Sequence, residues 1–360
     1  MLIGIDASKT AIKEKTGIDN TAYQIIFNLE KIDQKNTYYL YSNKPINSQL
    51  KQRDNFQEKL IPFPKFWNRL RLPLALLRDK PEKFLQLTNV IPSFAPPKTA
   101  VLIHDLAFKF FPEAYSSFEL ILQETAIKSA IEKAELIIFS CNANKKDFLK
   151  YYQFPENKIR IVPLAYDDAT FKKKGDDKNI LTDSSYFIFV GRLEKRKNLI
   201  QIIEAFGNFK DKTKSNYKLM LVGKKGYGYD EIENKIKSSK HKKDIVITGY
   251  LSNEKLADLY RMACGLIYPS LYEGFGLPIL EAMACGIPVI TSDIPTLKEI
   301  SGDAALLVDP QNTKSIVEEM EKIAFDKKKR LELISKGLER IKYFSWAKTA
   351  NQIYKVLEEM

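Results

Sequence analysis

The sequence predicts an α/β fold made of two Rossmann-like domains, each built around a parallel sheet. Short apolar, β-branched runs alternate with segments of helical periodicity along the 360 residues. Such alternation is typical of parallel sheets with right-handed crossovers. A polar, glycine-containing stretch, FKKKGDDKNILTDSS (171–185), separates two series of these runs. Because a chain of this length ordinarily forms two domains, we expect one on each side of that stretch, facing each other across a cleft.

The first series contains five runs with the composition of buried strands. They are LIGID (2–6), TYYLY (37–41), AVLIH (100–104), LIIFS (136–140) and IRIVP (159–163). The segment 117–133 and the segment beginning NANKKDFLKYY (142–152) have helical periodicity. These elements predict a first domain over residues 1–168 and a linker over 169–184.

The second series contains six such runs. They are YFIFV (186–190), YKLMLV (217–222), DIVITG (244–249), GLIYPS (265–270), PVITS (288–292) and AALLV (304–308). Beyond residue 308 the pattern is helical, and in FSWAKTANQIYKVLEEM (344–360) Trp346, Ala350 and Ile353 recur at helical spacing. The sequence therefore predicts a second domain over 185–342 and an amphipathic closing helix over 343–360.

Composition indicates a soluble globular protein, with 44% hydrophobic and 28% charged residues. The three cysteines, Cys141, Cys264 and Cys285, have neither the number nor the spacing of a disulfide framework or a metal site. The first apolar run is broken by Asp6, and no stretch has the roughly 18 apolar residues of a membrane span. We therefore expect a cytoplasmic protein with no metal.

The formal net charge of +12 is spread along the chain and leaves several kinds of partner open. Nucleic acid, anionic lipid and phosphorylated ligands all fit a basic protein, and so does a plain lysine-rich surface. Because no nucleic-acid-binding motif is present and the charge is diffuse, nucleic acid is the less favoured partner.

A basic turn follows the first strand of the second series. Ligands of open α/β sheets bind at the carboxyl ends of the strands. Here YFIFV runs directly into GRLEKRKN, which contains Gly191, Arg192 and Lys197. An arginine fork and a lysine charge after a sharp glycine turn suit phosphate oxygens. The alternative is a solvated basic turn.

A second loop lies in YEGFGLPILEAMACGIPVITS (272–292). Pro278 fits the start of a helix that runs to about Cys285, and Gly286 fits its carboxyl-terminal cap. The amides of Gly276 and Leu277 would then lie at the helix N-terminus, where an anion is favoured.

Glu273 and Glu281 flank this loop, with Glu281 expected in the first turn of the helix. Carboxylates repel phosphate but accept hydrogen bonds from hydroxyl groups. A ligand with a diphosphate in its middle and polyols at each end would satisfy the acids and the amides together. A nucleotide sugar has that shape.

The first domain offers two weaker candidates. His104 ends the strand AVLIH and is one of two histidines in the chain. Gly17, in KEKTGIDNTAYQ, would bring backbone amides toward a phosphate. The glycines of LVGKKGYGYDE (221–231) match a dinucleotide-binding fingerprint only loosely, so no nicotinamide or flavin cofactor is expected.

Taken together, these motifs resemble the family 4, or "group 1", glycosyltransferases of the GT-B fold, which are retaining enzymes that use nucleotide sugars. The resemblance covers essentially the whole chain. It rests on IHDLAFKFFPEAYS, GRLEKRKN, ITGYLSNEKLADLY, YPSLYEGFGLPILEAMACGIPVITS and the terminal FSW-type helix, which occur in family order. The resemblance implies a metal-independent hexosyltransferase of polysaccharide synthesis whose last helix crosses back onto the first domain.

The resemblance also implies roles for individual residues. Arg192 and Lys197 would neutralise the leaving diphosphate, Glu273 would contact the donor sugar, and His104 would lie beside the transferred sugar. The donor would further be held by Gly17, Gly191, Gly249, Tyr250, Gly274, Phe275, Gly276, Leu277 and Glu281, with Glu281 on the ribose and Gly249-Tyr250 at the base. GDP-mannose is favoured over a UDP-sugar by overall similarity. A front-side displacement is expected, in which the departing phosphate oxygen helps to deprotonate the acceptor.

One motif departs from the family pattern. Relatives often read G-[IV]-G-R-Y-x-Y where this chain has GIDNTAY (17–23), so Asp19 and Asn20 replace a glycine and an arginine. The departure leaves the role of Gly17 in place and puts the loop shape and the acceptor contacts in doubt. A non-catalytic homologue that binds a nucleotide or a sugar remains an alternative, although every matched donor-site position is present.

The segment 61–84 is open to two interpretations. It mixes Phe63, Phe66, Trp67 and several leucines with six basic residues and two acidic ones. One interpretation is an interfacial patch that receives a lipid-linked acceptor at an anionic membrane surface. The other, which we favour, is an ordinary first-domain helix that packs its leucines inward.

Overall fold

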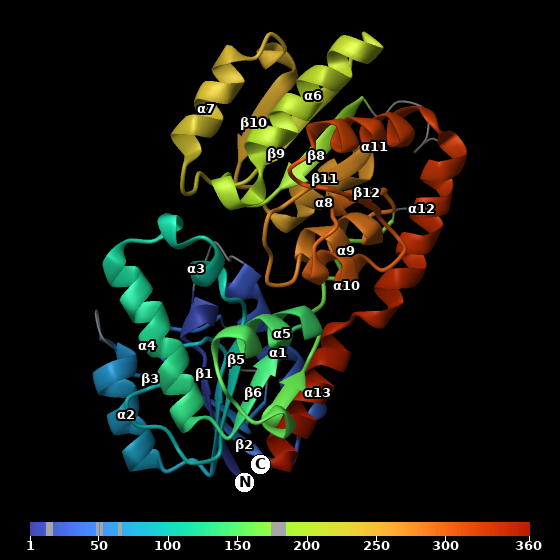
Figure 1. Ribbon diagram of the computed structural model, residues 1–360. Coiled ribbons are helices and arrows are strands. Elements are labelled where there is room, and N and C mark those ends of the chain that lie inside the picture. Colours follow the sequence, from blue (N-terminus) through green and yellow to red (C-terminus); the bar gives the residue numbers. More distant parts are fainter. Residues whose placement is uncertain (12–16, 48–49, 51–52, 64–66, 174–184) are drawn as a thin grey trace. The chain divides into compact units, whose positions relative to one another are not determined.

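The computed structural model of the protein describes residues 1–11, 17–47, 50, 53–63, 67–173 and 185–360. The chain divides into two compact units (Figure 1). The first unit comprises Met1–Leu164 together with Trp346–Met360, and the second comprises Ala165–Ser345. Of the predicted linker, residues 174–184 lie outside the described part of the chain.

The first unit is built on a seven-stranded parallel sheet in the order β3-β2-β1-β4-β5-β6-β7. Its strands are β1 (Leu2–Asp6), β2 (Thr37–Ser42), β3 (Phe56–Leu60), β4 (Lys83–Gln86), β5 (Thr99–Ile103), β6 (Leu136–Phe139) and β7 (Ile159–Ile161). The strand order changes direction between β1 and β4, which is the switch point where doubly wound sheets bind ligands.

Helices connect these strands and cover the sheet. They are η1 (Ser8–Ala11), α1 (Gly17–Ile32), α2 (Trp67–Asp79), α3 (Ala107–Phe110), η3 (Pro112–Ala114), α4 (Ser117–Lys133), α5 (Asn142–Tyr151), η4 (Glu156–Lys158) and α13 (Trp346–Glu359). The predicted helices over 117–133 and from 142 onward are confirmed as α4 and α5. A capping box at Ser116 and Glu119 satisfies the first amides of α4 and explains its sharp start.

Two strands of the first sheet, β3 and β4, were not predicted from the sequence. β3, FQEKL, is an edge strand that is mostly polar, as edge strands commonly are. β4, KFLQ, is a central strand whose two polar ends are buried and hydrogen-bonded. Lys83 Nζ donates to the carbonyl of Leu357 at 2.6 Å, and Gln86 Nε2 donates to Asp6 Oδ2 at 2.8 Å. Because these partners lie far away in the sequence, the polar ends of β4 made this buried strand look like an exposed segment.

The closing helix α13 belongs to the first unit and packs against α1, which confirms that the C-terminal helix returns to the first domain. Its buried side includes Trp346, Ala350, Ile353 and Leu357. The hydrogen bond from Lys83 to Leu357 ties the last turn of α13 to the centre of the sheet. A cation is favoured there because helix carbonyls carry partial negative charge at the carboxyl end.

Helix α2 carries two sets of leucines. Leu72 and Leu76 are buried, which agrees with the inward-packing interpretation of this segment. Leu70, Leu74 and Leu77, however, are 53%, 60% and 47% exposed and lie on one face at helical spacing. Residues 64–66, including Phe66, lie outside the described residues. No helix in the described part of the chain is long and apolar enough to cross a membrane.

The second unit is built on a six-stranded parallel sheet in the order β10-β9-β8-β11-β12-β13. Its strands are β8 (Tyr186–Val190), β9 (Lys218–Val222), β10 (Ile245–Gly249), β11 (Gly265–Tyr268), β12 (Val289–Ser292) and β13 (Leu306–Val308). All six strands were predicted, and the parallel Rossmann-like sheet is confirmed. Its switch point lies between β8 and β11.

The second unit has helices on both faces of its sheet (Figure 1). They are η6 (Lys195–Lys197), α6 (Leu199–Thr213), α7 (Tyr229–Ser238), η7 (Lys242–Asp244), α8 (Asn253–Met262), α9 (Leu277–Ala284), α10 (Pro295–Ser301), α11 (Thr313–Phe325), α12 (Lys327–Arg340) and η8 (Ile341–Tyr343).

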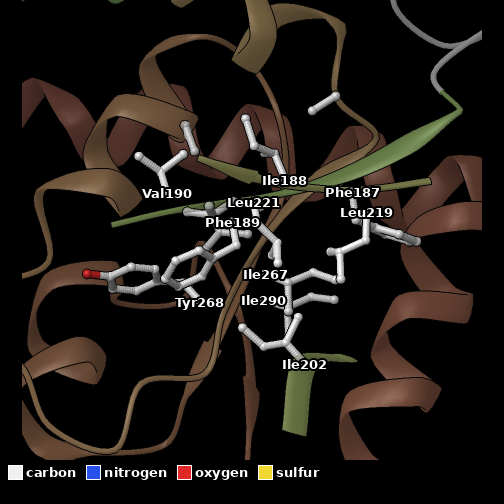
Figure 2. Packing of buried hydrophobic residues seen from close by; sticks show 14 of the residues in the cluster. Phe187, Ile188, Phe189, Val190, Ile202, Leu219, Leu221, Ile267, Tyr268 and Ile290 are labelled. Atoms are coloured by element: carbon white, nitrogen blue, oxygen red, sulfur yellow. The ribbon is translucent and has the colours of Figure 1, made fainter. Parts of the chain in front are cut away.

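The core of the second unit reaches the edge of the sheet where a ligand would bind. Figure 2 shows aromatic and aliphatic side chains from β8, β9 and β11 packed together. At the carboxyl ends of β8 and β11, the rings of Phe189 and Tyr268 are stacked, 5.9 Å apart and 20° from parallel. Tyr268 is 2% exposed, so its hydroxyl occupies a fixed place at the end of β11.

Candidate functional site

The turn after β8 approaches the loop after β9 very closely. A Cβ atom on Gly223 would lie 1.8 Å from the carbonyl oxygen of Gly191, and Gly223 has φ +145°. Only glycine fits there. The glycine run over 221–231 therefore serves backbone packing, and Gly226 lies against Glu194 in the same way. This packing places the turn that carries Arg192 and Lys197.

Lys197 and Glu273 form a buried ion pair at the carboxyl ends of β8 and β11. Lys197 Nζ lies 2.5 Å from Glu273 Oε1 and 3.2 Å from the Tyr268 hydroxyl. Both charged side chains are less than 10% exposed. Burial opposes ionisation of Glu273, but Lys197 and then Arg196 outweigh it and hold the pKa of Glu273 below its ordinary value. Both predicted residues thus belong to one charged cluster.

Arg192, the other predicted cation, lies at the exposed end of the same cluster. Its side chain is 67% exposed, and its Nε is 3.9 Å from Glu194 Oε2. Glu194 in turn bonds Arg196, whose Nη1 is 3.6 Å from Glu273 Oε2. Charges therefore alternate in sign from Arg192 to Lys197, and the cluster ends in a solvent-accessible guanidinium suited to an anion.

Sequence reasoning missed two members of this region, Arg196 and Asn198. Arg196 donates to the Tyr272 carbonyl at 2.9 Å, and Asn198 donates to the carbonyls of Pro269 and Pro310 at 3.0 and 2.6 Å. Asn198 has φ +62°, an uncommon conformation that asparagine tolerates better than most residues. The only signal in the sequence was their position on either side of Lys197 in the tripeptide RKN. The carbonyl groups that Arg196 and Asn198 bind lie more than 70 residues away in the chain, so the sequence pattern does not reveal these contacts.

Helix α9 presents its N-terminus at the predicted loop. It begins at Leu277, with Gly276 as the N-cap at φ +100° and Pro278 as the second residue. Gly286 follows the helix at φ +78°. The predicted helix and its cap are therefore present, displaced by one residue. The Phe275 side chain is buried and its ring lies 6.0 Å from that of Phe344, so this side chain is not available to a ligand.

Glu281 lies in the second turn of α9, not in the first turn as predicted. The helix begins at Leu277, one residue earlier than predicted, so Glu281 is its fifth residue. The Tyr260 hydroxyl is 3.2 Å from Glu281 Oε2. Burial raises the pKa of Glu281 to about 7. Glu281 is a partly buried carboxyl group next to the Tyr260 hydroxyl, and its predicted contact with a ribose stays a prediction.

Gly249 and Tyr250 follow β10. Gly249 has φ +73°, and the Tyr250 ring is 44% exposed with Lys224 Nζ 5.0 Å from its centroid. An exposed aromatic ring beside a cation suits a nucleobase and its phosphates. Their predicted role at the base is compatible with this exposure.

In the first unit, His104 directly follows β5. Its Nε2 lies 2.9 Å from the Leu87 carbonyl oxygen. Because a carbonyl only accepts, Nε2 carries the proton. Burial lowers the pKa of His104, so the ring is neutral near pH 7 and Nδ1 is left as an acceptor. A sugar hydroxyl is the kind of donor that fits it.

Gly17 begins the described part of α1, and residues 12–16 of the predicted glycine loop lie outside it. Asp19 and Asn20 fall in the first turn of the helix, and Asp19 is buried. Among the described residues, no group of three or more His, Cys, Asp or Glu side chains could hold a metal ion.

Residues 171–340 match the family model described as "Glycosyl transferases group 1". The chain is 29% identical over 269 residues to the O-antigen chain mannosyltransferase B of Escherichia coli, an alignment that covers 72% of this chain and 71% of that protein. It is 28% identical over 267 residues to the serotype-specific mannosyltransferase WbdA of Escherichia coli. That alignment covers 71% of this chain but only 33% of WbdA, so the chain spans about a third of that relative's length.

Solved structures show the same architecture. Sucrose-phosphate synthase from Thermosynechococcus elongatus superposes with a TM-score of 0.80 at 19% identity, over 100% of this chain and 98% of that one. HepE from Anabaena in complex with UDP-glucose gives a TM-score of 0.77 at 16% identity, over 100% and 99% of the two chains. At these identities the likeness establishes the fold.

Proposed function

The chain is a group 1 glycosyltransferase of the GT-B fold, and from this premise we propose that it transfers a hexose from a nucleotide diphosphate sugar to a glycan or lipid-linked acceptor in the synthesis of a cell-surface polysaccharide. Mannose is the favoured hexose and GDP-mannose the favoured donor, because the mannosyltransferases named above are among its relatives.

The observation that carries this proposal is the buried Lys197–Glu273 pair beside the N-terminus of α9. An ammonium group has three N–H donors, and Glu273 and Tyr268 account for two of them. The third donor, the exposed Arg192 and the amides of Gly276 and Leu277 are suited to a diphosphate. The carboxylate of Glu273 is suited to the hydroxyls of the adjoining sugar.

The remaining predicted residues complete the proposed donor site. In this proposal Glu281 holds the ribose, Gly249 and Tyr250 flank the base, and Gly191 and Gly274 lie in the two loops that bind the diphosphate. For the first unit by itself, we propose from the family resemblance that His104 accepts a hydrogen bond from a sugar hydroxyl through Nδ1 and that Gly17 supplies a backbone amide to a phosphate.

Transfer is proposed to proceed with retention at the anomeric carbon. Glu273 is held by Lys197 and Tyr268, so it is a poor nucleophile and acts as a hydrogen-bond acceptor. The leaving phosphate oxygen helps to deprotonate the acceptor hydroxyl on the same face of the sugar. Arg192 and Lys197 stabilise the charge that develops on the departing diphosphate, without a metal ion.

A screen of donors tests the proposal directly. The thermal unfolding midpoint would be measured with GDP-mannose, GDP-glucose, UDP-glucose, UDP-galactose and the free nucleotides. A ligand at 100 times its Kd stabilises a protein by about 2.7 kcal/mol, so one nucleotide class should stand out. Stabilisation by none of them would contradict the enzyme proposal. The anomeric configuration of the product, measured by ¹H NMR, would then test retention.

Two other functions differ in their expected results. A non-catalytic homologue would be stabilised by a nucleotide sugar but would release no nucleoside diphosphate with any acceptor extract. A nucleic-acid-binding protein would instead be stabilised by oligonucleotides in a strongly salt-dependent way. No specific contact among the described residues favours either of them.

A peripheral contact with an anionic membrane is proposed for the exposed face of α2. On this face Leu70, Leu74 and Leu77 are flanked by Arg69 and Arg71, the arrangement of an interfacial helix. Such a contact would place the enzyme at the cytoplasmic surface, where a lipid-linked acceptor would be found.

Flotation with liposomes tests the membrane contact. The protein should float with phosphatidylglycerol vesicles at low salt and not with phosphatidylcholine vesicles. Changing Leu70, Leu74 and Leu77 together to Gln should abolish flotation, whereas Leu331→Gln, at a leucine of α12 that is 46% exposed, should not. Equal flotation of both variants, or none of the wild type, would contradict the contact.

A further inference from the structure

Arg196 connects two segments that meet at the candidate site. It lies in η6, next to Lys197, and its guanidinium donates to the Tyr272 carbonyl at 2.9 Å and to Glu194 Oε1 at 2.8 Å. The backbone adds a second link, since the amide of Leu271 donates to the Arg196 carbonyl at 2.9 Å. Arg196 therefore holds the residue immediately before Glu273.

The contact between Arg196 and the Glu273 carboxylate itself is different. Nη1 lies 3.6 Å from Glu273 Oε2, which is too long for a good hydrogen bond. Lys197 already neutralises this carboxylate at 2.5 Å. The close bonds of Arg196 go to the loop and to Glu194, so its main effect on Glu273 is to fix the backbone that carries it and to add a favourable charge.

Arg196 is also poorly placed to bind a ligand directly. Its side chain is 19% exposed, compared with 67% for Arg192 in the same turn. We propose that Arg196 is a positioning residue, which holds Glu273 in place for the donor sugar through the Tyr272 carbonyl and does not itself contact the diphosphate. The inference rests on the proposed role of Glu273.

A double-mutant cycle with Glu273 tests the inference. Arg196→Gln should lower kcat about 10- to 100-fold, because a displacement of about 1 Å of a group that positions the reacting sugar has an effect of that size. The donor KM should change less than about threefold, because contacts with the diphosphate remain. Arg196→Lys should recover part of kcat. In a Glu273→Gln background, Arg196→Gln should cause little further loss, since the residue that it positions is already changed.

Arg261→Gln is the matched control. Arg261 is 12% exposed, donates to the carbonyls of Thr170 and Lys172, and pairs with Asp258, so its loss has a similar structural effect in the same unit. It should leave kcat within about twofold and remain additive with Glu273→Gln. Two results would overturn the inference and assign Arg196 to direct ligand binding. One is a loss of kcat from Arg196→Gln that is fully additive with the loss from Glu273→Gln. The other is a large rise in donor KM in Arg196→Gln.

A measurement without substrate separates this inference from the proposed function. The carboxyl ¹³C signal of Glu273, assigned by its loss in Glu273→Gln, would be titrated in donor-free protein. Its pKa should be higher in Arg196→Gln than in the wild type and unchanged in Arg261→Gln. An unchanged pKa in Arg196→Gln would overturn the inference, whereas failure of the wild type to turn over any donor would count only against the function.

Discussion

At the scale of single residues, the site combines groups that would each be unfavourable alone. A buried lysine or a buried carboxylate destabilises a fold unless it is paired. Lys197 and Glu273 satisfy each other, and Tyr268, fixed by its stacking on Phe189, bonds the lysine. The pair is therefore formed within the second unit without a ligand, and such preorganisation would suit the electrostatic stabilisation that we propose for it.

We expect Lys197→Ala to lower turnover by about 10²- to 10³-fold, the usual effect of removing one donor that stabilises developing charge. Lys210→Ala is the matched control, because Lys210 is also buried and is paired with Asp244 at 3.0 Å in the same unit. Steady-state kinetics at saturating donor would measure both. Near-normal turnover in Lys197→Ala would remove this lysine from the site.

Glu281 should make stability depend on pH. Burial raises its pKa from 4.5 to about 7, so between these values the folded state binds more protons than the unfolded state. The free energy of unfolding therefore falls as pH rises through this window. Glu281→Gln keeps an acceptor for Tyr260 but cannot ionise, and it should raise Tm by roughly 2–4 °C at pH 8 and have no such effect at pH 4. Scanning calorimetry at both pH values would check this. A larger rise in Tm at pH 4 than at pH 8 would contradict a raised pKa for Glu281.

At the scale of elements, the site depends on short segments with unusual backbone conformations. Helix α9 can begin where it does because Gly276 adopts φ +100°. A Cβ atom there would also lie 2.9 Å from Leu297 Cδ2. Any other residue would therefore strain the turn that presents the first amides of α9.

Gly276→Ala should consequently lower both Tm and donor affinity. If the strained turn weakens donor binding by roughly 1.4 kcal/mol, the donor Kd rises about tenfold, and we expect a rise of at least this size. The matched control is Gly207→Ala in the middle of α6, where the added methyl group meets nothing within 4 Å. That change should stabilise the protein by about 0.5–1 kcal/mol, because alanine favours helix. Isothermal titration and thermal melts of both variants would decide, and equal donor Kd values would show that the α9 turn does not bind the donor.

Sequence patterns predicted most elements because eleven strands are apolar runs with local boundaries. They failed at β3 and β4, where the polar residues are explained by an exposed edge and by partners such as Leu357 that are hundreds of residues distant. The candidate site likewise contains residues that the sequence predicted and others that it did not. Lys197 and Glu273 stand in recognisable motifs, whereas Arg196 acts through a backbone carbonyl, a contact that leaves no pattern in the sequence.

At the scale of the whole molecule, the chain forms two units with separate hydrophobic clusters, and α13 belongs to the first. A protein of this kind need not unfold in a single step. Substitutions in α13 should therefore lower the stability of the first unit and leave that of the second unit unchanged.

Ile353→Ala, at a fully buried position of α13, should lower the stability of the first unit by about 2–5 kcal/mol. Differential scanning calorimetry should show one transition moving to lower temperature while the donor-stabilised transition keeps its midpoint. Gln352→Ala, at the exposed neighbouring position, serves as the control. An equal shift of all transitions would mean that the units unfold together.

The return of α13 to the first unit also determines when that unit can be completed during synthesis. Residues 165–345, a stretch of 181 residues by subtraction, are translated between the body of the first unit and the helix that covers α1. At elongation rates of about 5–20 residues per second, this interval lasts roughly 10–40 s. Throughout it the buried face of α1 lacks its cover, so the nascent chain presents an apolar surface to chaperones until the second unit has been made.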